Sequence, residues 1–306
     1  MNDLPLVTIA IPTYNRVEYL KQALASAQAQ TYPNLEIIVS DNASSDGTQA
    51  FMERVTDKRV RYTRQLDNLG MIANWNDCLN QASGKYFLLL SDDDLLEREA
   101  ILYLTQHLEI DENLVFSYSC TKFINSRGNL IKKSKNGLEI EQTSNLIKAY
   151  MMSKRELPLC GILFRKSELF FDNEYSFAAD TKAWLDICFS NPKAFVKWIK
   201  LPQVSYRVHQ ENATATSNFS YWVSNLLGVG LYYKSRSLDK NKNAIFNYYF
   251  FRNTFYLLVK DRKKTIFIDK SVEIEMRKNI SKPLFLLIKF SVKIKCAIFG
   301  NGNLQG

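Results

Sequence analysis

The first ninety residues alternate between short apolar runs and stretches with helical spacing, and this alternation limits the folds open to the chain. Strand-like runs cover residues 6–12, 35–40, 59–64 and 86–90, and helix-like stretches cover residues 18–30, 48–55 and 71–82. Strands that alternate with helices in this way form parallel sheets covered on both faces. We therefore expect an α/β fold with a mostly parallel, Rossmann-like sheet flanked by helices.

A polar cluster follows each of the four predicted strands. The clusters are residues 13–16, 41–42, 67–68 and 91–94. In open sheets of this kind, ligands bind beyond the carboxyl ends of the strands. The four clusters are therefore the candidate binding site.

The last cluster, Ser91, Asp92, Asp93 and Asp94, is called the acidic turn below. Adjacent carboxylates repel one another, which raises their pKa values unless a cation or hydrogen-bond donors offset the repulsion. Mg²⁺ and Mn²⁺ are typically held by one or two carboxylates together with substrate phosphates. The acidic turn therefore predicts a divalent cation that bridges to a diphosphate. The alternative is a solvated loop in which Asp93 or Asp94 caps a helix starting near Leu96.

The positive charge of the chain is concentrated near its end. The net charge is +9, but residues 231–306 hold 16 Lys and Arg against 5 Asp and Glu, and residues 1–230 hold 24 against 26. Such a basic tail predicts an anionic partner, either phospholipid headgroups or nucleic acid. Along residues 278–299, four lysines fall within about 60° on a helical wheel whose remaining surface is chiefly apolar. This pattern predicts a helix lying in a membrane interface, and the alternative is a helix packed on protein.

Two further features bear on location. The five cysteines are scattered and include no Cys-x-x-Cys pair, which argues against a disulfide framework or a zinc site. No basic region precedes an apolar stretch at the N-terminus, and no run reaches the roughly 18 uncharged apolar residues of a membrane-spanning helix. We expect a cytoplasmic protein that is peripheral on the inner face of the cell membrane.

Four separated segments together resemble the family 2 glycosyltransferases, which have the GT-A fold. The segments are residues 7–16, 36–48, 68–76 and 84–94, and the resemblance covers roughly residues 6–210. It implies an inverting hexosyltransferase that uses Mn²⁺ or Mg²⁺. The donor would be a UDP- or dTDP-type sugar, and the acceptor a hydroxyl of a cell-surface glycan or a lipid-linked glycan.

The resemblance also implies which residues bind the nucleotide. These are Pro12, Thr13, Tyr14, Arg16, Asp41, Asn68, Asn74 and Asp92. An aspartate such as Asp41 can accept a hydrogen bond from the N3–H of uracil or thymine, Tyr14 can stack on the base, and Arg16 can donate to ribose or phosphate. The alternatives are an Asx-turn at Asp41 and a solvated helix start at Arg16.

In the acidic turn, Ser91 stands where the family often has its first aspartate. By comparison with relatives that have a hydroxyl residue there, Asp92 would bind the ribose and Asp93 would ligate the metal. We expect Asp94 to cap the helix that follows. The metal would neutralise the charge that develops on the nucleotide leaving group.

Two residues farther along the chain complete the implied site. Asp180 occupies the place of the family's Glu-Asp element, with Ala179 in place of the Glu, and would be the catalytic base; the alternative is a helix N-cap. His209 ends the segment Tyr206-Arg207-Val208-His209 and would ligate the metal or contact the diphosphate. We interpret the other histidine, His107, as an ordinary surface or interhelical residue.

The predicted domains are a GT-A catalytic domain, residues 1–218, and a basic helical extension, residues 219–306. The catalytic domain would comprise a nucleotide-binding half, residues 1–112, and an acceptor-side half, residues 113–218. An oligomer is compatible with this organisation, and the extension would bind an anionic membrane surface.

Three rival functions differ in how well they fit the sequence. A nucleotidyltransferase would need a phosphate loop with glycine and lysine after the first strand, and residues 12–16 contain neither. A nucleic-acid-binding protein using the basic tail would leave Asp92, Asp93 and Asp180 unexplained. A catalytically inactive nucleotide-sugar-binding protein is compatible with Ser91 and Ala179.

Overall fold

The computed structural model describes residues 4–134, 137–151, 154–175 and 178–209. By its internal contacts the chain divides into two compact units, and the first, Met1–Ile147 with Lys154–Asn212, contains almost all of these residues. The predicted basic extension and its boundary at residue 218 lie outside the described residues. They therefore stay predictions.

The first half of the sheet has the predicted β-α order. Its strands are β1 (Val7–Thr13), β2 (Leu35–Asp41), β3 (Val60–Arg64) and β4 (Tyr86–Leu89), and its helices are α1 (Val17–Gln28), α2 (Thr48–Met52) and α3 (Met71–Gln81). All three strand pairings, in the order β3-β2-β1-β4, are parallel. Thr13 lies opposite Asp41 in the β1–β2 register, so the two polar clusters that follow these strands lie side by side.

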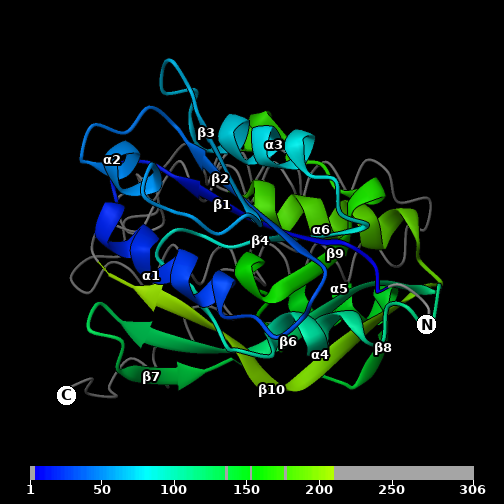
Figure 1. Cartoon of the computed structure of the whole chain (residues 1–306). Coiled ribbons are helices and arrows are strands. Elements are labelled where there is room, and N and C mark those ends of the chain that lie inside the picture. The colour runs from blue at the N-terminus through cyan, green and yellow to red at the C-terminus, as the bar shows by residue number, and fades with distance from the viewer. Residues whose placement is uncertain (1–3, 135–136, 152–153, 176–177, 210–306) are drawn as a thin grey trace, which may run out of the picture. The chain divides into compact units, whose positions relative to one another are not determined.

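The second half of the sheet is mixed. It contains β5 (Leu95–Leu96), β6 (Leu114–Asn125), β7 (Leu130–Lys133), β8 (Ile140–Gln142), β9 (Ile162–Arg165) and β10 (Phe195–Val208), with helices α4 (Ala100–Thr105), α5 (Thr143–Met151) and α6 (Ala179–Ser190). β9 runs antiparallel to both β4 and β6, whereas the long strands β6 and β10 pair in parallel. The antiparallel strand β9 therefore lies between two parallel parts of the sheet, and the mixed α/β fold confirms the predicted class (Figure 1).

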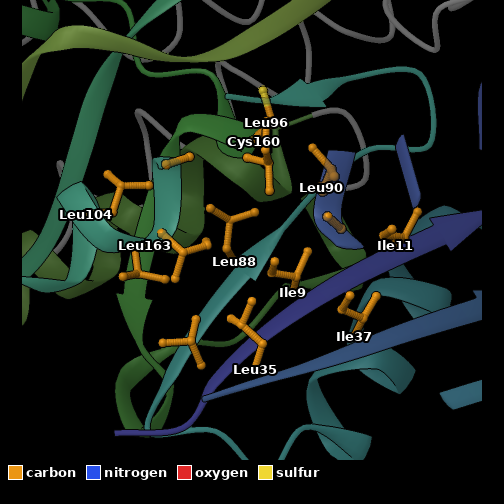
Figure 2. Packing of buried hydrophobic residues seen from close by; sticks show 14 of the residues in the cluster. Ile9, Ile11, Leu35, Ile37, Leu88, Leu90, Leu96, Leu104, Cys160 and Leu163 are labelled. Carbon is orange, nitrogen blue, oxygen red and sulfur yellow. The ribbon is translucent and has the colours of Figure 1, made fainter. Parts of the chain in front are cut away.

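The hydrophobic core explains why these residues form strands. Alternate residues of β1, such as Ile9 and Ile11, point to the same face and are fully buried in one cluster with Leu88 (Figure 2). Leu20 of α1 belongs to the same cluster. Burying each such side chain contributes about 2 kcal/mol. On the other face α3 covers β1 and β2 with its own buried residues. Both faces are thus covered, which leaves the strand ends as the place for a polar site.

Within the described part of the chain, no helix is long and apolar enough to cross a membrane.

Candidate active site

The carboxyl ends of β1 and β4 meet at the acidic turn. The backbone N–H of Leu90 donates to the carbonyl of Ala10 at 2.9 Å, which continues the β1–β4 ladder to the end of β4. Beyond it, the Thr13 hydroxyl donates to Asp92 Oδ2 at 2.8 Å, and both residues are buried. The structure therefore joins the predicted nucleotide loop to the predicted metal-binding turn.

Arg16 links the same two segments through charge. Its Nη1 lies 3.3 Å from Asp92 Oδ1 and 3.1 Å from Asp93 Oδ2, and its side chain is 25% exposed. Burial and the neighbouring charge of Asp93 raise the pKa of Asp92 to about 7, against the opposing effect of Arg16. The crowding predicted from three consecutive carboxylates is thus present, and Arg16 only partly offsets it.

His209 lies against the acidic turn at the end of β10. Its Nε2 is 2.9 Å from Asp93 Oδ2, and its ring centroid is 4.8 Å from that of Tyr19 on α1. Asp93 and His209 are 116 positions apart in the sequence. The structure therefore brings the two predicted metal ligands together.

Arg207 is a site residue to which the sequence interpretation gave no role. It is buried, its guanidinium lies over the ring of Tyr19, and its Nε donates to the backbone carbonyl of Asp93 at 2.8 Å. The two other guanidinium nitrogens donate to the Gln22 side chain at 2.9 Å and the Ser126 carbonyl at 3.1 Å. Arg207 therefore fixes both the acidic turn and the strand end that carries His209. The Tyr-Arg-x-His segment pointed to Arg207, but it could not show which residues Arg207 contacts.

The expectation that Asp94 caps a helix is wrong. The next element is β5, which pairs with Val204 and Ser205 of β10, and the following helix α4 begins only at Ala100. Asp94 instead accepts a hydrogen bond from the backbone N–H of Arg207 at 2.8 Å. It is fully buried, and burial together with the charge of Asp93 raises its pKa well above the usual range.

Asp41 forms a second cluster at the end of β2. Its Oδ1 accepts from the backbone N–H of Ser44 at 2.8 Å, and its Oδ2 accepts from the Tyr62 hydroxyl at 2.7 Å and Arg64 Nη1 at 3.1 Å. Asp41 is fully buried, and its bond with Ser44 ties it to the local backbone. Burial, and then the contact with Asp41, raise the pKa of Tyr62 to about 12. A base contact by Asp41 stays a prediction, and Tyr62 and Arg64 were not anticipated.

The remaining predicted nucleotide residues differ in their surroundings. Asn74 is buried and bonded to Ser40 through both its amide nitrogen, at 3.1 Å, and its amide oxygen, at 2.7 Å. Asn68 accepts from Asn42 Nδ2 at 2.8 Å. Asn68 thus links the loops after β2 and β3, and Asn74 ties α3 to the end of β2. Tyr14 is 44% exposed, which leaves its ring accessible for stacking, and Pro12 lies within β1.

Asp180 lies in the first turn of α6. The N-cap position belongs to Ala178, so the alternative of Asp180 as N-cap is wrong. Its Oδ1 accepts from the backbone N–H of Thr181 at 2.6 Å, and the residue is half-buried. Burial raises the pKa of Asp180. Its role as base stays a prediction.

The acidic turn suits a cation that is only partly ligated by protein. Within the described residues, no group of three or more His, Cys, Asp and Glu could hold a metal, but Asp93 and His209 offer two adjacent donors. Mg²⁺ and Mn²⁺ are commonly bound by one or two carboxylates, with substrate phosphates completing the shell. The residues therefore fit a divalent cation that binds together with a diphosphate.

Comparisons with known proteins define first the fold and then the family. The structure of S. aureus TarS in complex with UDP-GlcNAc matches with a TM-score of 0.66 at 16% identity, covering 87% of this chain and 77% of that chain. This likeness places the fold among the GT-A glycosyltransferases. Residues 8–168, more than half of the chain, match the family described as Glycosyl transferase family 2. The chain belongs to this family and is a glycosyltransferase.

Two relatives extend the comparison. An uncharacterized glycosyltransferase of Haemophilus influenzae is 28% identical over 253 residues, which cover 76% of this chain and 78% of the relative. The GalNAc(5)-diNAcBac-PP-undecaprenol beta-1,3-glucosyltransferase of Campylobacter jejuni is 33% identical over 190 residues. That match covers 60% of this chain and 60% of the relative.

Proposed function

We propose that this protein transfers a sugar, with inversion, from a nucleotide-diphosphate donor to a hydroxyl of a glycan acceptor. One observation carries the proposal, namely that a buried acidic turn is joined by described contacts to Thr13, Arg16 and His209. Carboxylates beside a guanidinium and an imidazole can hold a cation and a diphosphate together.

The donor site would extend along the sheet edge from Asp93 to Asp41. Arg16 would contact the diphosphate, and the exposed ring of Tyr14 would stack on a uracil or thymine near Asp41. Asp93 and His209 would hold Mn²⁺ or Mg²⁺. When bound, this cation stabilises the negative charge that develops on the leaving nucleoside diphosphate.

The acceptor must lose a proton as its oxygen attacks the anomeric carbon opposite the leaving group. Asp180 would take this proton at its carboxylate, which the Thr181 N–H orients. A base works best when its pKa lies near the operating pH, and burial shifts the pKa of Asp180 upward, in that direction. Transfer by an ionised Asp180 should increase as pH rises through this raised pKa.

The acceptor class is supported by a relative. The name of the Campylobacter enzyme describes a glycan on undecaprenyl diphosphate. We infer a similar lipid-linked or cell-surface glycan here, reached from the cytoplasmic side of the membrane.

The test is a panel of UDP- and dTDP-sugars assayed for nucleoside diphosphate release, with Mn²⁺, Mg²⁺ or chelator, and with or without glycan acceptors. Acceptor-stimulated release that requires metal is the expected result. If no donor binds in the presence of metal, the proposal fails.

The role of Asp180 has a separate test. Asp180→Asn should reduce transfer by about 10²–10⁴-fold while donor binding is retained. In the wild type, the acid limb of the pH profile of kcat/KM should have an apparent pKa above the ordinary aspartate value of about 4. A loss of donor binding in Asp180→Asn as large as its loss of transfer would contradict the assignment.

A further inference from the structure

The hairpin formed by β6 and β7 presents apolar and basic side chains that the reaction does not use. All four residues of β7 are exposed, with Leu130 at 57% and Ile131 at 56%. Residues 114–134 contain four basic residues and no Asp or Glu. Within the described sheet β7 pairs with β6 alone and lies at an outer edge (Figure 1).

The basic side chains of the hairpin are not equivalent. Lys122 pairs with Glu97, and Lys132 pairs with Glu156 and packs over the ring of Phe123. Arg127 in the turn and Lys133 at the end of β7 are exposed. Two exposed cations therefore flank the adjacent Leu130 and Ile131.

This surface lies beside the candidate active site. Asn125 is paired with Val208 in the β6–β10 register, and the Ser126 carbonyl accepts from Arg207 Nη1 at 3.1 Å. The same guanidinium donates to the carbonyl of Asp93. One side chain therefore spans from the hairpin turn to the acidic turn.

We propose that the β6–β7 hairpin is a membrane contact, with Leu130 and Ile131 in the interfacial layer of an anionic phospholipid bilayer and Arg127 and Lys133 on its headgroups. Apolar side chains ringed by basic ones are the combination that binds such interfaces. Lysines also protect edge strands from pairing with other chains, which disfavours a second strand as the occupant.

The contact would serve the proposed reaction by holding the acidic turn close to a lipid-linked acceptor. It does not depend on the predicted basic extension, because its residues lie within the described sheet. It is also separable from the proposed function, because none of the four hairpin side chains is assigned to donor binding.

The test measures binding of the full-length protein to vesicles of phosphatidylcholine, alone or mixed with an equal part of phosphatidylglycerol. Each exposed basic residue contributes about 1 kcal/mol, so the double variant Arg127→Glu/Lys133→Glu should lower the partition onto mixed vesicles by at least about tenfold. Leu130→Asp/Ile131→Asp should also lower it. Matched controls are Lys58→Glu and Ile110→Asp, exposed residues outside the hairpin, which should bind like the wild type.

Metal-dependent binding of UDP, measured on the same samples, reports whether each variant is folded and should be unchanged. Hairpin variants that bind mixed vesicles as the wild type does would overturn the proposal and leave membrane binding to other residues. A change in oligomeric state with unchanged vesicle binding would also overturn it, in favour of a second copy as the occupant.

Discussion

Asp41 and Asp93 are both buried at the carboxyl edge of one sheet, yet their surroundings differ. Asp41 is held by Ser44, Tyr62 and Arg64, all within 23 positions in the sequence. The Asp93 carboxylate contacts Arg16 and His209, which come from distant parts of the chain. Asp41 thus belongs to a locally completed hydrogen-bond cluster, whereas Asp93 belongs to a junction of three segments.

The difference extends to charge. At the end of β2, one carboxylate meets one guanidinium. In the acidic turn three carboxylates are adjacent, and the pKa values of Asp92 and Asp94 are raised by burial and by Asp93. A site with this excess of buried carboxylate gains most from an added cation. The end of β2 is therefore stabilised by protein groups alone, whereas the acidic turn is suited to a metal and a diphosphate.

The largest expected effect comes from Asp93→Asn. Transfer should fall by about 10²–10³-fold, because the variant loses the carboxylate that we propose holds the cation beside the leaving group. Its stability should change little, because neutralising Asp93 also relieves repulsion on Asp92. Steady-state kinetics and thermal denaturation measure the two quantities, with the exposed Glu112→Gln as the acid-to-amide control. Activity equal to that of the control would contradict the assignment.

Arg207→Met should lower the free energy of unfolding by about 3 kcal/mol, because it leaves the Asp93 carbonyl and the Gln22 side chain without their donor. It should also weaken metal-dependent nucleotide binding, since Asp93 and His209 would no longer be held in place. Denaturant unfolding and nucleotide titration provide the readouts, and Arg98→Met on the exposed surface is the control. Unchanged metal dependence in a folded Arg207→Met protein would show that Arg207 does not position the site.

Asp41→Asn should differ from Asp93→Asn, because it should lower stability and leave the metal dependence of nucleotide binding intact. It removes the charge that pairs with Arg64, which is one-third exposed, so the expected loss of stability is about 2 kcal/mol. Nucleotide affinity should fall with and without metal alike. A variant as stable as the wild type would show that the Asp41 cluster does not stabilise the end of β2.

The smallest effect is expected for Tyr62→Phe, which removes one hydrogen bond to Asp41 and should cost about 1.5 kcal/mol. The pKa of Tyr62 is raised to about 12 from an ordinary value of about 10. The contribution of the tyrosine should therefore be complete below pH 10 and should disappear as pH rises through about 12. Unfolding measured across this range, with Tyr103→Phe as control, checks both statements. A pH-independent difference between the two variants would contradict them.

The sequence predicted the half of the fold in which strands and helices alternate along the chain. Up to Leu90, each strand and helix can be recognised from the spacing of its apolar residues. The parallel ladders β3-β2-β1-β4 confirm the predicted parallel sheet. The antiparallel insertion of β9 between β4 and β6 joins segments far apart in the chain, and no local pattern encodes that pairing. The prediction of Asp94 as a helix cap was wrong for a similar reason. The two residues that follow Asp94 pair with β10, which is distant in the sequence, and do not start a helix.

The site was predictable where residue types specify chemistry. Three adjacent aspartates indicated a crowded acidic turn, and the resemblance joined Asp93 to His209. Their hydrogen-bond partners were not predictable, because a buried Arg207 that donates to Asp93, Gln22 and Ser126 depends on side-chain packing across the sheet.

The most direct test titrates UDP into the wild type, Asp93→Asn and Asp41→Asn, each with Mn²⁺ and with chelator. The account predicts that Mn²⁺ strengthens binding to the wild type and to Asp41→Asn, but not to Asp93→Asn. If Asp93→Asn retained the full enhancement by Mn²⁺, the acidic turn would not be the cation site and the central claim would be wrong.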